Sequence, residues 1–158
     1  MDNYLVVNGI KIEFTEKQLK ALGIETNAFS RKSNQLYYFI DEYGDVVTHH
    51  DNTNWDAAQY NVANYCTDEA LMKKRALHET LNRLLWRFSM ENDGDKIDWN
   101  DYSQQKYFIY FDAYLECNIN WDGLCRMGAV YFYTREIAEQ AINEVVKPFI
   151  EKHPEFKC

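Results

Sequence analysis

The stretch that decides the fold is Asn52-Thr53-Asn54-Trp55-Asp56, because it returns later in the chain as Asn118-Ile119-Asn120-Trp121-Asp122. The chain has only four tryptophans, so two of them in the same five-residue frame indicate a duplicated unit. Matches on both sides keep the same order, among them Tyr38-Phe39-Ile40 with Tyr107-Phe108-Ile109. We therefore predict an internal repeat, residues 36–90 and 105–152, with Trp55 and Trp121 in equivalent positions.

The first copy is predicted to contain three strands and a long helix. Runs rich in aromatic and β-branched residues predict strands over residues 36–40, 46–48 and 60–66. Leucines at helical spacing, without a Gly or Pro between residues 68 and 91, predict the longest helix of the chain, with Thr67 as its cap. The residues that follow, Asn92-Asp93-Gly94-Asp95, should end this helix.

The second copy repeats this pattern. Strands are predicted over residues 107–111, 114–118 and 127–133, with a turn near Asp112-Ala113. Thr134 should cap a second amphipathic helix. Pro148 should distort or shorten the last turn of that helix, because proline removes a backbone donor.

The N-terminal residues 4–23 are predicted to form a hairpin followed by a helix. Asn8-Gly9 favours a type I′ turn between strands over residues 4–7 and 10–13. Thr15 and Gln18 have the spacing of a capping box, and Gly23 closes the short helix.

Together these elements predict an α+β fold with an N-terminal ββα unit and two duplicated ββ(β)α units. The sheet should be mainly antiparallel, with helices packed on one face. The linker between the copies is short, so we expect a single compact domain over residues 1–158.

Composition narrows the class of protein. The four cysteines have irregular spacing, which is typical of a reduced, cytoplasmic protein and makes a zinc site improbable. Neither a signal peptide nor a membrane-spanning segment is expected, because no apolar run approaches the required length of about 20 residues.

Charge is strongly segregated along the chain, whose formal net charge is −8. Residues 41–69 carry seven carboxylates and no Lys or Arg, and residues 91–122 carry eight carboxylates against two lysines. Residues 70–90 are basic. Segregated charge steers partners, although charged residues can also simply solvate a surface.

Patterns for catalysis and metal binding are absent or incomplete. The chain has no Gly-x-Ser-x-Gly frame and no glycine-rich phosphate loop. A calcium loop starting at Asp93 would place Asp98 where glycine belongs, so a helix stop is favoured. His49-His50-Asp51 can give at most one His to any one site on a strand, so a surface turn is favoured there. We expect no enzymatic activity, metal or cofactor.

Aromatic residues make up 16% of the chain. Most should fill the core, but Tyr and Trp are also enriched at binding hot spots. For the repeated frame, a turn that caps its own backbone is favoured over a binding loop.

Three stretches resemble an uncharacterised family of small acidic proteins from bacteriophages and mobile elements of gut Firmicutes. They are residues 37–41, residues 60–68 and the helix over residues 76–87. The resemblance covers residues 4–156 and implies an accessory protein of a mobile element. By analogy, such proteins often bind and block host defence machinery, including CRISPR effectors.

The leading hypothesis is a non-enzymatic inhibitor of a host defence nuclease, acting in the bacterial cytoplasm as an acidic mimic of nucleic acid. Its partner would be a basic protein such as a CRISPR effector or another defence nuclease. The candidate partner-binding residues are Asp41, Glu42, Asp45, Asp51, Trp55, Asp56, Asp93, Asp95, Asp98, Trp99, Asp101, Trp121 and Asp122.

Two alternatives remain open. The first is a nucleic-acid-binding module using the basic helix over residues 70–90, although direct nucleic-acid binding is not the favoured hypothesis. Its candidate residues are Lys73, Lys74, Arg75, Arg83 and Arg87. The second is a protein that binds or sequesters a small molecule between the two copies.

Overall fold

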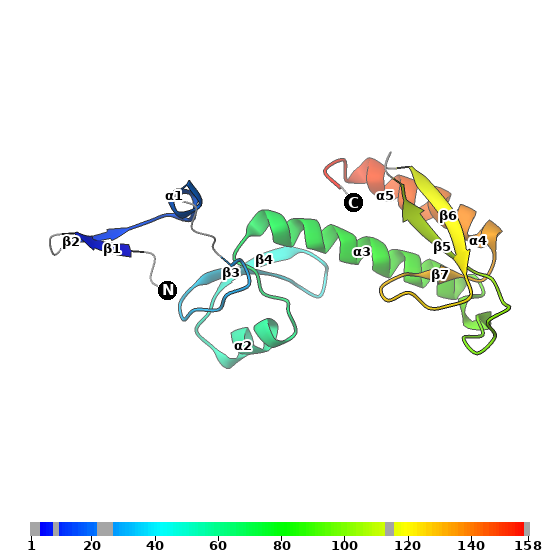
Figure 1. Cartoon of the computed structure of the whole chain (residues 1–158), viewed down its shortest axis with the longest axis horizontal. Helices are drawn as coiled ribbons and strands as arrows, with labels where there is room; N and C mark the ends of the chain where they lie inside the picture. The colour runs from blue at the N-terminus through cyan, green and yellow to red at the C-terminus, as the bar shows by residue number, and fades with distance from the viewer. Residues whose placement is uncertain (1–3, 8–9, 22–26, 113–115, 157–158) are drawn as a thin grey trace. The chain divides into compact units, whose positions relative to one another are not determined.

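The computed structural model describes residues 4–7, 10–21, 27–112 and 116–156 (Figure 1). Contacts within the chain define two compact units. Unit 1 consists of Met1–Phe39 and Val47–Glu69, and unit 2 consists of Ile40–Val46 and Ala70–Cys158. That residues 1–158 form a single domain stays a prediction.

Helices and strands alternate irregularly, and the predicted α+β class with antiparallel pairing is confirmed. β1 (Tyr4–Val7) pairs antiparallel with β2 (Ile10–Glu13), and β5 (Lys106–Phe111) pairs antiparallel with both β6 (Cys117–Asp122) and β7 (Tyr131–Phe132). None of the helices in the described part of the chain is both long and apolar enough to cross a bilayer. The elements are β1 (Tyr4–Val7), β2 (Ile10–Glu13), α1 (Glu16–Ala21), β3 (Leu36–Ile40), β4 (Val46–His50), α2 (Asn54–Asn61), α3 (Glu69–Glu91), η1 (Gly94–Lys96), β5 (Lys106–Phe111), β6 (Cys117–Asp122), β7 (Tyr131–Phe132), α4 (Arg135–Ala141), η2 (Ile142–Val146) and α5 (Lys147–Lys152).

The N-terminal ββα segment has the predicted order. The Thr15 amide donates to Gln18 Oε1 at 2.8 Å, and the Gln18 amide donates to Thr15 Oγ1 at 3.3 Å, which completes the capping box. The predicted turn at Asn8-Gly9 and the predicted stop at Gly23 lie outside the described residues.

Unit 1 contains the strands of the β3–β4 hairpin, followed by α2. A bridge between Tyr38 and Cys66 adds a short third segment on the other edge of β3. The predicted strand over residues 60–66 is wrong, because α2 extends to Asn61 and only Cys66 pairs with β3. Thr53 is the N-cap of α2, because its side chain accepts from the Asp56 amide.

Unit 2 is built around a three-stranded sheet with strand order β6-β5-β7. Alternate residues of β5 and β6, among them Ile109 and Ile119, pack with Leu81 and Leu85 of α3. Ala138 and Val146, from the helical run over residues 135–152, join the same cluster. The helices of unit 2 therefore cover one face of its sheet, as predicted.

The cap predictions have different outcomes. Thr134 caps α4, since its hydroxyl accepts from the Ile137 amide at 3.3 Å. Thr67 does not cap α3, because the helix begins two residues later at Glu69 and the Thr67 hydroxyl donates instead to the Ala28 carbonyl at 3.2 Å. That hydroxyl ties the start of α3 to the loop before β3.

The last helical run is distorted as predicted at Pro148. Residues Ile142–Val146 form a π-helical segment between α4 and α5. Proline has no amide hydrogen and its ring crowds the carbonyl four residues earlier, so the regular α-helical bonding cannot continue through this point.

The repeat is only partly reproduced. Both copies have a hairpin, a short third segment beside its first strand and a following helix. Trp55 and Trp121 are not equivalent, because Trp55 lies in α2 and Trp121 lies in β6. The predicted strands over residues 114–118 and 127–133 also shift: β6 covers Cys117–Asp122, β7 covers Tyr131–Phe132, and residues 114–115 are not described.

Candidate functional site

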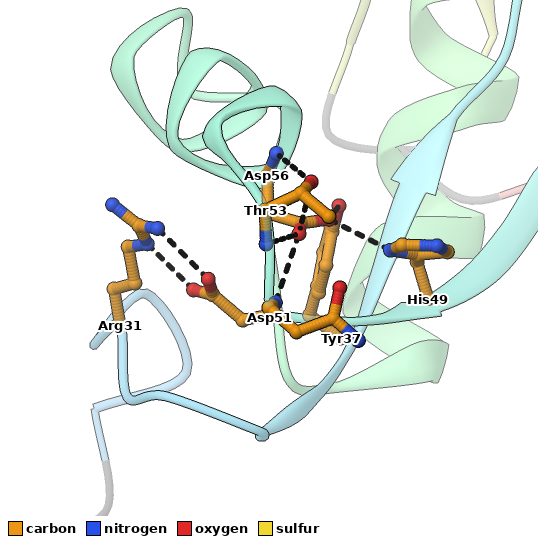
Figure 2. A network of polar contacts seen from close by, with 7 residues as sticks. Arg31, Tyr37, His49, Asp51, Thr53 and Asp56 are labelled. Atoms are coloured by element: carbon orange, nitrogen blue, oxygen red, sulfur yellow. Dashed lines mark hydrogen bonds and ion pairs between the residues drawn. The ribbon is translucent and has the colours of Figure 1, made fainter.

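Asp56 is the centre of a buried polar network in unit 1 (Figure 2). Its side chain is completely buried. Oδ1 accepts from the Tyr37 hydroxyl at 2.6 Å and contacts His49 Nδ1 at 2.7 Å. Oδ2 accepts from the backbone amides of Asn52 and Thr53 at 2.9 and 2.7 Å, and from the Thr53 hydroxyl at 2.7 Å.

Local sequence explains this arrangement. Thr53 is the N-cap of α2, and Asp56 is the third residue of the helix, where its carboxylate can reach back to the N-cap amide. The same carboxylate is also directed toward β3 and β4, which supply Tyr37 and His49. One side chain thus joins the helix to both strands of the hairpin.

These contacts shift two pKa values in opposite directions. Burial alone would raise the pKa of Asp56, but the hydrogen bonds from Tyr37, Thr53 and the two backbone amides together hold this pKa well below its usual range. Burial, and next the bond to Asp56, raises the pKa of Tyr37. Asp56 therefore stays ionised and Tyr37 stays neutral across the physiological pH range.

A second contact anchors the loop before β3. Arg31 Nε and Nη2 donate to the two carboxylate oxygens of Asp51 at 2.5 and 2.8 Å. The Asp51 amide donates to the Gln35 carbonyl at 3.0 Å, so this buried aspartate fixes both its side chain and its backbone to the loop. The bidentate pair raises the pKa of Arg31.

Tyr65 contacts this network through its ring and not through a hydrogen bond of its hydroxyl. Its ring stacks on Tyr37 at 4.1 Å, and its buried hydroxyl has no hydrogen-bond partner. Burial, together with the nearby charge of Asp51, raises the pKa of Tyr65 to about 12.

The network corrects two predicted partner-binding residues. Asp51 is 2% exposed and Asp56 is 0% exposed, so neither presents charge to a partner. Their carboxylates are used inside unit 1 because each has several strong donors within reach. Trp55 is 46% exposed but also packs edge-on against Phe39 at 4.9 Å and His49 at 5.6 Å.

The remaining carboxylates of the first copy lie at the hairpin tip. Asp41 is half-buried, and its Oδ1 accepts from the amides of Tyr43 and Asp45, both at 2.9 Å. It therefore closes the turn. Glu42 and Asp45 have exposed side chains.

The acidic loop, defined here as Asp93–Asp101, is exposed on unit 2 at all four of its predicted carboxylates. Asp93 pairs with Lys96 at 2.9 Å, and Asp95 lies in η1. Asp98 accepts from the Asn100 amide, and Asp101 accepts from the amide and hydroxyl of Ser103. These internal bonds hold the carboxylates of Asp98 and Asp101 in defined positions.

Lys106 fixes the C-terminal end of the acidic loop by hydrogen bonds to its backbone. This lysine is fully buried, and its Nζ donates to the carbonyls of Asp101 and Gln104 at 2.7 and 3.2 Å. Its ammonium also lies 5.7 Å from the centre of the Trp99 ring. Trp99 packs edge-on against Tyr131 at 5.3 Å and remains 45% exposed.

A neighbouring loop completes this surface. A Cβ added at Gly123 would lie 2.7 Å from the Tyr102 carbonyl, so the backbones of the two loops are in direct contact. Tyr102 and Leu124 are 72% and 59% exposed. Trp121 pairs with Tyr107 on the helix-facing side of the sheet, opposite the side that carries Lys106, so Trp99 and Trp121 do not share one surface. Asp122 is half-buried and pairs with Arg126 at 3.0 Å.

Two of the five predicted basic residues of α3 are paired with a carboxylate of the same helix. Glu79 pairs with both Arg75 and Arg83, at 2.6 and 3.1 Å, which offsets part of the positive charge. The side chains of Lys73, Lys74 and Arg87 are exposed.

Sequence reasoning missed the polar network but had a signal for part of it. Thr53 followed three residues later by Asp56 is the spacing of a capping box. The contributions of Tyr37 and His49 depend on the hairpin register, which the sequence does not state.

Comparisons with known proteins give no further identification: no protein-family model, no curated protein and no solved structure matches the chain. Within the described residues, no group of three or more His, Cys, Asp or Glu is placed to hold a metal ion.

Proposed function

We propose that the chain is a non-enzymatic binding protein that uses an acidic-aromatic surface of unit 2. This surface consists of the acidic loop together with Tyr102 and Leu124. The observation that carries the proposal is the backbone contact between Tyr102 and Gly123, which brings exposed apolar side chains next to fixed carboxylates. Aromatic anchors beside a polar rim are the usual composition of a protein-binding surface.

The partner we propose is a basic protein. Four aspartates against Lys96 alone give the acidic loop a negative field, and the partner's field should be complementary. Because the Asp98 and Asp101 carboxylates are already fixed by hydrogen bonds, little side-chain entropy is lost on binding. Carboxylates held in this way can occupy positions that nucleic-acid phosphates would take.

The most specific form of the proposal follows from the resemblance to proteins of phages and mobile elements. In that form the partner is the nucleic-acid channel of a host defence nuclease, and binding blocks it.

A competition experiment tests the proposal. The tagged protein is incubated with host lysate, and captured proteins are identified before and after adding duplex DNA. We expect a nucleic-acid-binding protein that DNA displaces and that a variant with Asp95, Asp98 and Asp101 changed to Asn does not capture. A variant with Lys73 and Lys74 changed to Gln is the matched control and should capture normally. Capture that neither the aspartates nor DNA affects would refute the mimic.

One observation favours the nucleic-acid-binding alternative. Arg83, Arg87 and the exposed Trp86 line a cavity of about 700 Å³ beside Tyr43 of the hairpin tip. Cations beside exposed aromatic rings are the pattern of single-strand binding. A gel shift at low salt separates the two functions. Binding that Arg83→Gln and Arg87→Gln abolish, with a salt slope near one per phosphate contact, would replace the mimic by this alternative.

A further inference from the structure

A cavity in unit 2 has a volume of about 870 Å³. It lies between the hairpin tip, the first half of α3 and the turn that follows α5. This volume is in the range that accommodates one small-molecule ligand, about 300–1,000 Å³, and is too small for a protein domain.

The walls of this cavity are fixed by contacts of their own. Gly44, with φ +90°, brings the hairpin tip so close to α3 that an added Cβ would lie 3.3 Å from Thr80 Oγ1. On the opposite side, the Phe156 ring packs against Phe149 at 5.5 Å and His78 at 4.8 Å. The cavity is therefore preformed, which reduces the entropy lost when a ligand binds.

The lining divides into an apolar part and a charged rim. Ala76, Leu77 and Phe156 supply apolar surface. Lys74 and Lys152, both exposed, contribute ammonium groups from two different elements, and Lys73 adds a third. Two carboxylates, Asp45 and Glu155, also line the cavity, and Glu155 Oε1 lies 3.5 Å from His153 Nδ1.

We propose that this cavity binds a small amphipathic anion: one apolar body, aliphatic or aromatic, carrying a carboxylate, sulfonate or phosphate group. The apolar body lies against Leu77 and Phe156, and the anionic group lies at the rim between Lys74 and Lys152. Charge complementarity selects this class of ligand, because the ammonium groups of Lys74 and Lys152 are brought to the same rim by two different elements. The site is separate from the acidic-aromatic surface, so either proposal can fail without the other.

Titration of the full chain with anilinonaphthalene sulfonate, an aromatic sulfonate that fluoresces in apolar sites, tests the proposal. Changing Lys74 and Lys152 together to Glu should weaken binding roughly tenfold, since two attractions become repulsions. Lys147→Glu is the matched control, because Lys147 is an exposed lysine at the start of α5 that does not line the cavity. Its affinity should equal that of the unchanged chain.

A second variant and a competitor keep the test decisive. Ala70→Trp should reduce binding by filling the cavity, with circular dichroism showing an unchanged fold. Dodecanoate should displace the dye, whereas dodecanol, which has the same chain without the charge, should not. Equal displacement by the two, or full binding in both the charge-reversed and the filled variants, would overturn the proposal.

Discussion

The two five-residue frames differ at one position, Thr53 against Ile119, and adopt different structures. In the first frame the threonine hydroxyl caps α2 and the aspartate turns back onto the cap. In the second frame Ile119 packs into the apolar cluster of unit 2, and the frame continues as strand β6. A hydroxyl that can bond the backbone favours a helix start, whereas a β-branched apolar side chain favours a strand.

The hairpins show where the two copies do correspond. Asp41 and Asp112 each follow the first strand of a hairpin and accept a bond from the amide four residues later, at 2.9 and 3.0 Å. Counting back from these aspartates, Phe108 takes the place of Tyr37. In unit 1 that position carries the hydroxyl that bonds to Asp56, and in unit 2 it carries a phenyl ring covered by the Arg126 guanidinium at 4.7 Å. One architecture thus holds a buried polar network in one copy and a cation–π contact in the other.

The largest difference between the two frames should appear when the aspartate of each is replaced by alanine. Asp56→Ala should reduce the free energy of unfolding by about 3–5 kcal/mol, because the buried Tyr37 hydroxyl would lose its acceptor and the amides of Asn52 and Thr53 would lose theirs at the start of α2. Asp122→Ala should cost no more than about 1 kcal/mol, since its partner Arg126 is exposed. Urea denaturation of both variants measures the difference.

The same aspartate predicts an acid dependence. Its pKa is depressed in the folded state, so its contribution is present above the unfolded pKa of about 3.9 and is lost as the pH falls further. The folded chain should therefore lose stability below about pH 4 more steeply than Asp56→Ala does. Parallel acid curves for the two proteins would contradict this assignment.

Alkaline pH should weaken unit 1 by a somewhat smaller amount. The pKa of Tyr65 is raised to about 12 in the folded state, against about 10 when unfolded, so its neutral form stabilises the fold below pH 10 and this contribution is lost as the pH rises toward 12. The expected loss is on the order of 2 kcal/mol. Denaturation at increasing pH measures it. Tyr65→Phe should reduce the slope between pH 10 and 12 and leave the part that comes from Tyr37, whose pKa is also raised in the folded state.

Two Tyr→Phe changes sharpen the contrast between polar and apolar copies. Tyr37→Phe makes the first hairpin resemble the second and should cost about 1–3 kcal/mol, because Asp56 loses a donor. Tyr65→Phe removes a hydroxyl without a hydrogen-bond partner and should change stability by less than about 0.5 kcal/mol near neutral pH. Equal losses in thermal or chemical unfolding would show that the Tyr37 bond is not special.

Exchanging Thr53, the residue that distinguishes the two frames, should have a smaller effect than removing Asp56. Thr53→Ile removes the cap of α2 and should cost about 1 kcal/mol. Thr134→Ala, which removes the cap of α4 in the other unit, should cost a similar amount. Unchanged stability in Thr53→Ile would mean that the capping hydroxyl does not decide between helix and strand.

The sequence predicted the features that depend on residues close to one another in the chain. The spacing of leucines predicted α3, the capping residues Thr15 and Thr134 were assigned correctly, and Pro148 marked the distorted helix. It failed where a residue's role depends on contacts distant in sequence. Thr67 bonds to Ala28 instead of capping, and the buried carboxylate of Asp51 pairs with Arg31 twenty residues earlier.

The candidate surface shows the same limit. Counting carboxylates identified the acidic loop correctly as exposed but could not separate Asp98 from Asp56, which is fully buried. Burial of Asp56 depends on how β3, β4 and α2 come together. Lys106, which is buried under the acidic loop, was counted from sequence only as a positive charge.

The hairpin tip with one residue of each strand, Ile40–Val46, belongs to unit 2, whereas the rest of β3 and β4 belongs to unit 1. This division has a topological consequence. The chain passes between the units three times, after residues 39, 46 and 69. Neither unit is therefore a continuous segment, and no single proteolytic cut can release one of them intact. Any attempt to isolate a unit must begin with a circularly permuted or internally joined chain.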